Sequence, residues 1–574
     1  INIEHFPAAI PGTSLIPGTA AFSPDPLNYG WRDYGNRVGL WRMMELMDKL
    51  GMRGTVCLNA EIIREYPRII EESLARDWAF IGHGINNAPA NFIGNAPDGE
   101  GGHTPLPEDK EREIISTVCQ TMEEALGKKT KGWLSPFLTH TDNTPKILEE
   151  NGFDVEYQIS DIPTSWLATW SNGEGGPTIA LGSDFDGVPS TSQYPGVAYE
   201  KPVVEGAPGH GEGHNIGLPI VITSAIAIKK IMIENNINGK LVIWPGVAEE
   251  ILGAKAWYVR DGYFDNVDMC IFTHVSTNMS TSWGRPSGTG LISVKYTFSG
   301  ETAHSAGSPW RARSALDAAE LMNVGWNYKR EHLHPDQRSH SIFLDAGDQP
   351  NVVPSKASIW YFLREITYKG IMEMYDAANK MAQGAALMTN TTYESEVLGA
   401  AWPRHFNKII AEEMYENIKK VGLPKWSEDD QRLARSVQKE IGIESINGLP
   451  TELPPLGKPL PYNVSGGSDD IGDVSWKVPT VVLRFPSNIP DVTFHHWSAS
   501  IAAATPIAHK GANAGAKVVA MTVVDFLTKP EKLAEAKNYF DNVQSKEDFY
   551  RPMISEKDPP PFYLNTEPMH PYQH

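Results

Sequence analysis

Short apolar runs alternate with Gly- or Pro-containing loops and helix-like stretches between residues 177 and 280. Three of these runs lead into loops rich in carboxylate or histidine residues: Pro177 to Leu181, Leu241 to Trp244 and Met269 to Phe272. Continuous apolar strands that alternate with helices predict a mostly parallel sheet with both faces covered. Ligands collect at the carboxyl ends of the strands in such sheets, so these loops are candidate functional segments.

A different pattern begins near residue 288. The stretch Leu291 to Phe298 alternates like a half-exposed strand, and Arg311 to Asn327 has the spacing of an amphipathic helix. Ser341 to Leu344 and Ala357 to Arg364 are typical of further strands. These elements predict a small α+β domain with one open sheet face. After about residue 400 the chain returns to helices and a buried strand, Pro479 to Phe485, so the insert splits a larger domain.

Composition narrows the class of protein. Hydrophobic residues make up 41% of the chain and charged residues 21%, as is ordinary for a globular enzyme. The formal net charge of -20 argues against nucleic acid or an anionic membrane as a partner. The three cysteines form no C-x-x-C pair, which predicts neither a disulfide framework nor a thiolate zinc cage. We therefore expect a cytoplasmic protein that binds a small molecule.

Five segments carry grouped histidine and carboxylate residues near expected strand ends. They are Asp184 with Asp186, the run Gly209 to Asn215, Glu249 with Glu250, His274, and His495 with His496. A single histidine or one Glu pair is more often an ordinary core or surface feature, so the coincidence of five segments is what indicates a site. Imidazoles and carboxylates around an open position are the ligands that a hydrolytic zinc or manganese centre needs.

Two of these segments suit metal-assisted hydrolysis in detail. In a Glu pair such as Glu249 and Glu250, one carboxylate can bind metal while its neighbour stays free as a general base. The glycines around Glu212 and His214 let the backbone bend so that both side chains can face one point. The sequence has no G-x-S-x-G elbow and no phosphate-binding loop, which disfavours serine hydrolases and nucleotide enzymes.

Six motifs in order carry a resemblance to a known family. They are Gly-Ser-Asp-Phe-Asp-Gly-Val-Pro (182–189), Gly-His-Gly-Glu-Gly-His-Asn (209–215), Pro-Gly-Val-Ala-Glu-Glu (245–250), Gly-Glu-Thr-Ala-His-Ser (300–305), Pro-Asn-Val-Val-Pro (350–354) and His-Lys-Gly (509–511). They closely resemble the aminoacylase and carboxypeptidase-like metallopeptidases, in particular the aminobenzoyl-glutamate hydrolase subgroup, over about residues 150 to 530. The resemblance implies an α/β fold: a two-metal α/β catalytic domain, interrupted by an α+β lid that also dimerises the protein. It also implies two divalent ions, zinc or manganese, as cofactors.

The same resemblance assigns the metal site. It implies His214, Glu250, His274 and His495 as ligands and Glu249 as the general base. Glu212 stands where the subgroup usually has a Cys that bridges the metals. A carboxylate can also bridge two ions and, as a harder ligand, favours zinc or manganese bound through oxygen. The alternative is that Glu212 marks a degraded site in a non-catalytic binding protein.

The lid contributes three further residues by resemblance. His304 is implied to reach the active site of a partner subunit in a homodimer, where it stabilises the oxyanion of the tetrahedral intermediate. Asn351 and Arg364 match substrate-binding lid positions, and the planar guanidinium of an arginine suits a substrate carboxylate. Arg364 could instead pair with a structural acid.

The first 150 residues resemble another family. Asn2-Ile3-Glu4, Tyr34 to Gly39, Gly82 to Asn87 and Gly132 to Pro136 are similar to polysaccharide deacetylases of the allantoinase-like branch. That family forms a distorted (β/α) barrel, of which this segment covers only a part. Its metal-binding members use an Asp and two spaced histidines, whereas here His83 is followed by Asn87. The two resemblances meet at residues 147–155.

These observations predict five segments. They are a partial deacetylase-like segment over 1–150, the catalytic domain over 151–287 and 401–530, the lid over 288–400, and a C-terminal tail over 531–574. The predicted activity is metal-dependent hydrolysis of an amide bond in an N-acyl amino acid or an aminobenzoyl-glutamate-like substrate. Besides a non-catalytic binding protein, one further alternative is a metal-free carbon–nitrogen hydrolase centred on Glu4 and His83.

Overall fold

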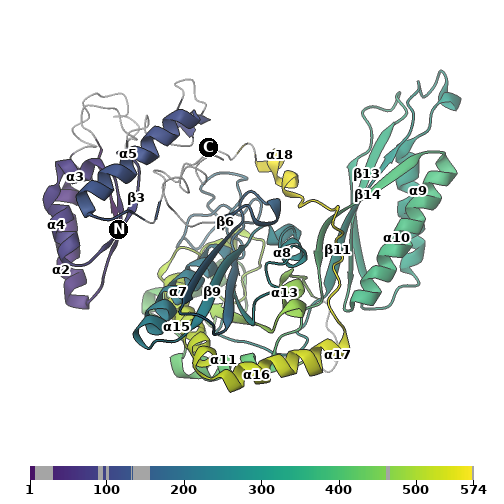
Figure 1. The fold of residues 1–574 in the computed structure, drawn as a ribbon. Coiled ribbons are helices and arrows are strands. Elements are labelled where there is room, and N and C mark those ends of the chain that lie inside the picture. Colours follow the sequence, from purple (N-terminus) through teal and green to yellow (C-terminus); the bar gives the residue numbers. More distant parts are fainter. Residues whose placement is uncertain are drawn as a thin grey trace. The chain divides into compact units, whose positions relative to one another are not determined.

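The computed structural model divides the chain into two compact units, residues 1–155 with 571–574 and residues 156–570 (Figure 1). It describes residues 1–6, 30, 32–87, 95–97, 103–105, 107–130, 132–133, 156–459, 466–569 and 571. The expected junction at 147–155 and motif residues 134–136 lie outside the described residues, and the second unit begins at Glu156.

The first unit contains a parallel sheet of three strands in the order β1 (Asn2–Ile3), β2 (Thr55–Leu58) and β3 (Ala79–Gly82). Helix α5 (Glu108–Leu126) packs Val118 and Met122 into the same core as Ile3 and Phe80. The helical spacing in this stretch therefore serves the core of the first unit. The other elements are a π-helix (Gly35–Gly39), α2 (Leu40–Leu50), α3 (Glu61–Glu65), α4 (Pro67–Ala75), β4 (Asn95–Pro97) and β5 (His103–Pro105).

The second unit is built on a six-stranded sheet in the order β15-β10-β8-β9-β7-β6. Its strands are β6 (Glu156–Tyr157), β7 (Trp166–Asn172), β8 (Thr178–Asp184), β9 (Gly239–Gly246), β10 (Met269–Ser276) and β15 (Thr480–Pro486). The four strands from β15 to β9 run parallel, and β7 pairs antiparallel with β9. This confirms the mostly parallel sheet that the apolar runs predict.

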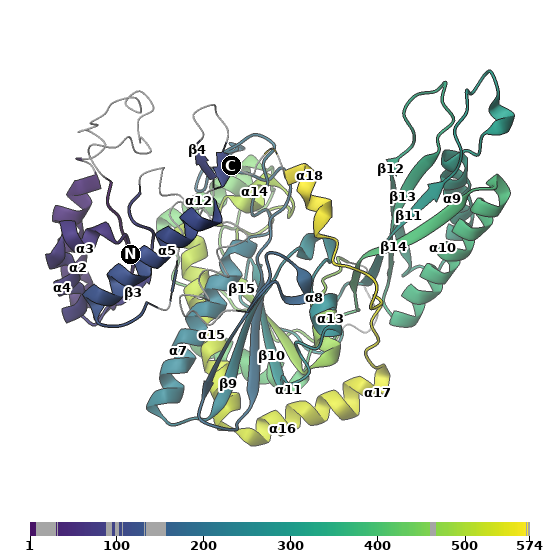
Figure 2. The same cartoon turned by 45° about the horizontal axis from the view of Figure 1, so that its top comes forward.

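Helices cover both faces of this sheet, as Figure 2 shows. One face packs against α7 (Gly217–Glu234), α11 (Lys408–Val421) and α15 (Pro506–Thr528), and the other against α8 (Lys255–Arg260) and α13 (Ile471–Lys477). Successive residues of β8 divide between the faces, since Ile179 and Leu181 join the first core while Ala180 joins the second. The apolar strands have no polar alternation because both faces are buried.

Helix α7, with the turn before it, is the one helix in the described part of the chain that is long and apolar enough to cross a membrane. Half of that stretch is buried inside the protein. Its Ile220, Val221 and Ile228 lie in the main core, and this packing accounts for the apolar composition.

The lid is a four-stranded antiparallel sheet in the order β12-β13-β11-β14, with two helices on one face (Figure 1). Its elements are β11 (Gly290–Ser299), α9 (Ala315–Arg330), β12 (Arg338–Asp345), β13 (Lys356–Glu365), α10 (Tyr368–Thr389) and β14 (Thr392–Ala401). Alternate strand residues such as Val294, Tyr296, Ile359 and Tyr361 pack beneath the helices. The chain thus has an α/β fold with an inserted α+β element, as the sequence predicts.

The segment from residue 531, expected as a tail, begins as helix α16 (Pro530–Tyr539). Farther along, the Tyr550 hydroxyl donates to Asp473 at 2.8 Å, and Met553 and Ile554 are buried in the same core as the lid. This segment is therefore packed at least as far as Ile554. The remaining helices are α12 (Glu428–Glu440), α14 (Trp497–Ser500), α17 (Ser545–Glu547) and α18 (Thr566–Met569).

Candidate metal centre

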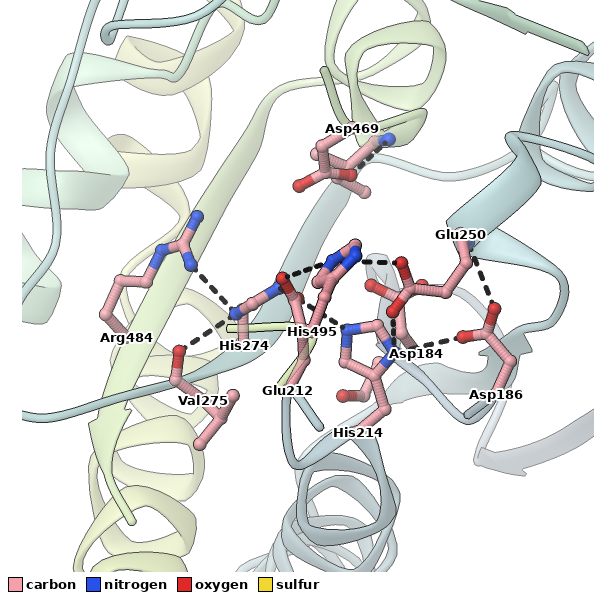
Figure 3. Close-up of polar contacts among 12 residues, drawn as sticks. Asp184, Asp186, Glu212, His214, Glu250, His274, Val275, Asp469, Arg484 and His495 are labelled. Atoms are coloured by element: carbon pink, nitrogen blue, oxygen red, sulfur yellow. Dashed lines mark hydrogen bonds and ion pairs between the residues drawn. The ribbon is translucent and has the colours of Figure 1, made fainter. Parts of the chain in front are cut away.

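The grouped carboxylates and histidines meet at the carboxyl edge of the large sheet (Figure 3). Asp184 ends β8, His274 lies near the end of β10, and Glu249 and Glu250 form the turn that follows β9. Because these strands are parallel, their carboxyl ends lie at one edge of the sheet. The segments that carry Glu212 with His214, and His495, reach the same edge from outside the strands.

Backbone conformation at this edge is unusual. Gly213, between Glu212 and His214, has a φ of +88°, which favours glycine. Ala248 and Leu252, on either side of the Glu249–Ile251 turn, have φ values of +53° and +56°, and His495 has +58°. Residues with side chains adopt this left-handed region at a cost, and such strain clusters at functional sites.

The carboxylate of Glu212 lies at the centre of the group. Its Oε2 is 3.3 Å from Nε2 of His214 and 3.4 Å from Nε2 of His274. Its Oε1 is 3.1 Å from Nε2 of His495, which is also 3.3 Å from Oε2 of Glu250. Each oxygen of Glu212 therefore faces a different set of donor atoms.

Hydrogen bonds orient two of the histidine rings. Asp186 Oδ1 lies 3.0 Å from Nδ1 of His214, and Asp186 Oδ2 accepts the backbone N–H of Glu250 at 3.0 Å. Nδ1 of His274 lies 2.9 Å from the Val275 carbonyl and 2.8 Å from the Arg484 guanidinium. Such contacts to Nδ1 leave Nε2 of each ring facing Glu212, as is usual for histidines that bind metal.

Charges within the cluster shift its pKa values in opposite directions. Burial would raise the pKa of Glu212, but the adjacent imidazoles of His214 and His274 outweigh it and lower this pKa. Burial would lower the pKa of His214, but Asp186 and Glu212 raise it well above its usual value. For Glu250, burial and then the charges of Glu212 and Asp186 raise the pKa to about 8. Bound cations would relieve this crowding of carboxylates.

The residues present fit a divalent metal. Nε2 of His214 and Oε1 of Glu250 are buried and have no hydrogen-bond partner, which is rare for polar atoms without a ligand. Glu212, His214 and Glu250 offer ligand atoms within 4.8 Å of one another, as do Asp184, His214 and His274. Imidazole and carboxylate donors at these separations suit zinc or manganese.

A second acidic cluster lies beneath the first. Glu249 is buried, and burial together with the charges of Asp184 and Asp469 raises its pKa well above the usual value. The fully buried ammonium of Lys255 opposes this shift. It lies 2.6 Å from Asp184 and 3.9 Å from Asp469, and it also contacts Asp470.

A cavity of about 350 Å³ opens over both clusters. Its lining consists of Glu212, Glu249, Glu250, Leu252, His274, Leu291, Phe362, Arg364, Arg404, Gly467, Ser468, Asp469, Arg484, Phe494 and His495. The structure thus brings together all the expected metal ligands, with His214 beneath Glu212, as well as the expected base Glu249 and the lid residue Arg364. The volume is in the range of small-molecule sites.

His304 and Asn351 do not line this cavity within one chain. Nδ1 of the exposed His304 accepts the backbone N–H groups of Ala306 and Gly307, each at 3.1 Å. The carbonyl of Asn351 accepts the N–H of Ser305 at 3.0 Å, so the two expected residues lie on adjoining loops of the lid. A role for either in a partner's active site stays a prediction.

Sequence reasoning overlooked Lys255, Arg404 and Arg484. Arg484 carried a usable signal, because it is a single charge inside the apolar run Pro479 to Phe485. Lys255 and Arg404 gave no comparable signal, since their partners lie far away in the sequence. Asp186 was in the candidate group, but its hydrogen bonds to His214 and Glu250 could not be foreseen from spacing.

The first unit has its own polar group. Glu4 Oε1 lies 3.2 Å from Nε2 of the buried His83, and this hydrogen bond lowers the pKa of Glu4 despite its partial burial. Asn87 is also buried there. All three groups in the described residues that could hold a metal ion lie in the second unit.

The fold and the cluster of imidazoles and carboxylates define a metallopeptidase-type amidohydrolase. The chain is 31% identical over 443 residues to one of the subunits of p-aminobenzoyl-glutamate hydrolase from Escherichia coli K12, covering 73% of this chain and 91% of that protein. It is 26% identical to the mouse Xaa-Arg dipeptidase, covering 66% of this chain and 78% of that protein. The chain therefore belongs to the p-aminobenzoyl-glutamate hydrolase family.

Two further comparisons concern the fold and the first unit. The crystal structure of the aminobenzoyl-glutamate utilization protein from Klebsiella pneumoniae matches with a TM-score of 0.44 at 18% identity, covering 74% of this chain and 83% of that chain. The family model for polysaccharide deacetylase matches residues 31–155. A deacetylase-like segment therefore precedes the amidohydrolase part of the chain.

Proposed function

We propose that the protein hydrolyses an amide bond in an N-acyl amino acid or an aminobenzoyl-glutamate-like substrate, with two divalent ions, zinc or manganese, as cofactors. The ions would be held by Glu212, His214, Glu250, His274 and His495. One observation carries the proposal: the two oxygens of Glu212 face separate sets of donors, His214 with His274 on one side and His495 on the other. A carboxylate so placed suits the bridging position in a two-ion site.

A bound metal would supply Lewis-acid polarisation of the amide carbonyl and would lower the pKa of water. Glu249 lines the same cavity, takes a proton from the attacking water and delivers it to the leaving amine nitrogen.

Arg364 is the proposed partner of a substrate carboxylate. Its guanidinium donates to the Ser468 hydroxyl at 2.8 Å, while its buried Nε has no hydrogen-bond partner. Burial lowers the pKa of Arg364, and no ion pair offsets this among the described residues. Among the described residues no acidic side chain forms an ion pair with Arg364. This favours a role in binding a substrate carboxylate over a role in pairing with a structural acid.

The proposed assembly is a cytoplasmic homodimer that forms through the lid. His304 and Asn351 lie together on the lid and away from the cavity of their own chain, as residues that serve a partner's site would. The three cysteines are free thiols, which suits a reducing compartment.

Metal removal combined with one substitution tests this function. Chelation should abolish hydrolysis of N-benzoyl-glutamate, and zinc or manganese should restore it. Glu249→Gln should retain metal but lose turnover by roughly 10²–10⁴-fold, the contribution of general acid–base catalysis. Glu320→Gln, at an exposed position on α9, is the matched control and should keep normal turnover.

Four outcomes would contradict the proposal. Full turnover after exhaustive chelation would exclude metal-dependent hydrolysis, and near-normal turnover of Glu249→Gln would place the base elsewhere. Loss of hydrolysis in Glu4→Gln, with metal still bound, would assign the chemistry to the first unit. Bound metal without hydrolysis of any N-acyl amino acid would support a binding protein.

A further inference from the structure

The open face of the lid sheet carries a row of three side chains on β13. Trp360, Phe362 and Arg364 alternate with Tyr361 and Leu363, which are buried on the helix side. The rings of Trp360 and Phe362 are 5.6 Å apart at an interplanar angle of 79°, and the Arg364 guanidinium lies 5.4 Å from the centre of the Phe362 ring. These contacts hold the row in register along the strand.

Phe362 belongs to two cavities. It lines the cavity over the candidate metal centre, beside Arg364. It also lines a second cavity of about 210 Å³, together with His340, Ile342 and Trp360. The two cavities therefore adjoin at Phe362, and the second extends the first along β13. We call the second cavity the lid groove.

The lid groove is apolar and carries no fixed charge. The Trp360 indole N–H donates to the Ser293 hydroxyl at 2.8 Å, so the polar atom of this side chain is already satisfied. Burial, with the charges of Arg364 and Arg330, lowers the pKa of His340, which keeps its ring neutral near pH 7. An uncharged planar group would be accepted here, and a carboxylate would be directed to Arg364.

We propose that the lid groove is the acyl subsite of the amidohydrolase and selects extended planar aromatic acyl groups, an inference that rests on the proposed amide hydrolysis. Residues two apart on a strand are separated by about 6.7 Å. When the substrate carboxylate meets Arg364, the first ring of the acyl group reaches Phe362. Only a second ring, attached end to end, reaches Trp360.

A graded series of substrates tests this register. N-acetyl-, N-benzoyl- and N-(4-phenylbenzoyl)-glutamate would be compared by kcat/KM on the full metal-loaded protein. Phe362→Ala should lower the ratio of benzoyl to acetyl on the order of tenfold, because one ring contact is lost. Trp360→Ala should lower the ratio of phenylbenzoyl to benzoyl by a similar factor and leave the ratio of benzoyl to acetyl unchanged.

Two further variants serve as a control and as a second test of the lid groove. Trp310→Ala removes a lid tryptophan that is 74% exposed and lies outside both cavities, so every ratio should match the unsubstituted protein. Ile342→Arg places a charge in the groove from a side chain that is 56% exposed, which the fold tolerates. It should lower the ratio of phenylbenzoyl to benzoyl even if Trp360→Ala fails to fold.

Binding separates this inference from the proposed function. Calorimetry with N-(4-phenylbenzoyl)-glutamate on Glu249→Gln should show affinity that falls about tenfold when Trp360→Ala is added. That result without any hydrolysis by the unsubstituted protein would support the subsite and refute the proposed activity. Normal hydrolysis with unchanged ratios in every groove variant would overturn the subsite alone. A change in oligomeric mass in Trp360→Ala would assign the groove to a second copy of the chain and also overturn it.

Discussion

Replacing Lys255 by Met tests whether the buried charges beneath Glu249 depend on one cation. The Lys255 ammonium lies 2.6 Å from Asp184 and 3.9 Å from Asp469, and it contacts Asp470. At an effective dielectric constant of about 20, single charges at these two distances attract by roughly 6 and 4 kcal/mol. Burying the ammonium costs several kcal/mol, so we expect the substitution to lower the free energy of unfolding by about 3–5 kcal/mol.

The loss of stability in Lys255→Met should be larger at high pH than at low pH. Burial raises the pKa of Asp470 to about 7 and also raises that of Asp184, while Lys255 opposes both shifts. Without the lysine both values rise further in the folded state. A carboxyl with a raised folded pKa stabilises the protein fully below its unfolded pKa and loses this contribution as the pH rises through the folded value. The variant should therefore be closer to the unsubstituted protein near about pH 5 than near about pH 8.

Urea unfolding, followed by circular dichroism at both pH values with metal in fixed excess, measures this effect. Lys230→Met, which breaks an exposed pair with Glu234 at 3.8 Å, is the control and should change stability by less than about 0.5 kcal/mol. Asp470→Asn added to Lys255→Met should restore part of the loss, because it removes one unpaired carboxylate. A loss below about 1 kcal/mol near pH 8, or equal losses at both pH values, would refute the reasoning.

Two further predictions concern acid stability and assembly. Burial lowers the pKa of His405 to about 4 against the opposing charge of Glu547, so its contribution is present above its unfolded pKa of about 6.5 and is lost as the pH falls. The free energy of unfolding should fall by up to about 3 kcal/mol as the pH is lowered toward about 4. His405→Phe keeps a ring packed on Trp476 but does not titrate, so it should flatten this pH dependence. An unchanged pH dependence would exclude His405 as its cause. Mixing His304→Ala with Glu249→Gln subunits should regenerate hydrolysis if each site uses the partner's histidine. Absence of complementation in subunits shown to exchange would place His304 outside the partner's site.

The sequence predicted the sheet because its strands are buried on both faces. Burial on both faces requires unbroken apolar runs such as Leu241 to Trp244, and β9 forms there. The lid strands could be predicted equally well. The alternation in Leu291 to Phe298 arises because helices cover only one face of the lid sheet. The cavity could be anticipated in part, because parallel strands bring Asp184, Glu249 and His274 to one edge.

Contacts between distant segments could not be predicted in the same way. Lys255 meets Asp470 across 215 positions, and neither residue's neighbours indicate the other. The division of donors around Glu212 depends on side-chain positions from two loops and the end of β10, which spacing alone does not fix. The placement of His304 and Asn351 outside the cavity follows from the turn at Ala306 and Gly307, where backbone N–H groups hold the His304 ring.

The insertion of the lid between β10 and β15 sets the order in which the polypeptide can fold during synthesis. His274 lies opposite Arg484 in the parallel pairing of these strands, 210 positions later in the chain. At about 5–20 residues per second, a ribosome needs roughly 10–40 s to deliver the second strand after the first. The strands of the lid are complete well before that time, so β10 waits with one backbone edge unpaired. An edge of this kind can pair with other nascent chains, so we expect translation speed and chaperone access to influence the yield of this protein.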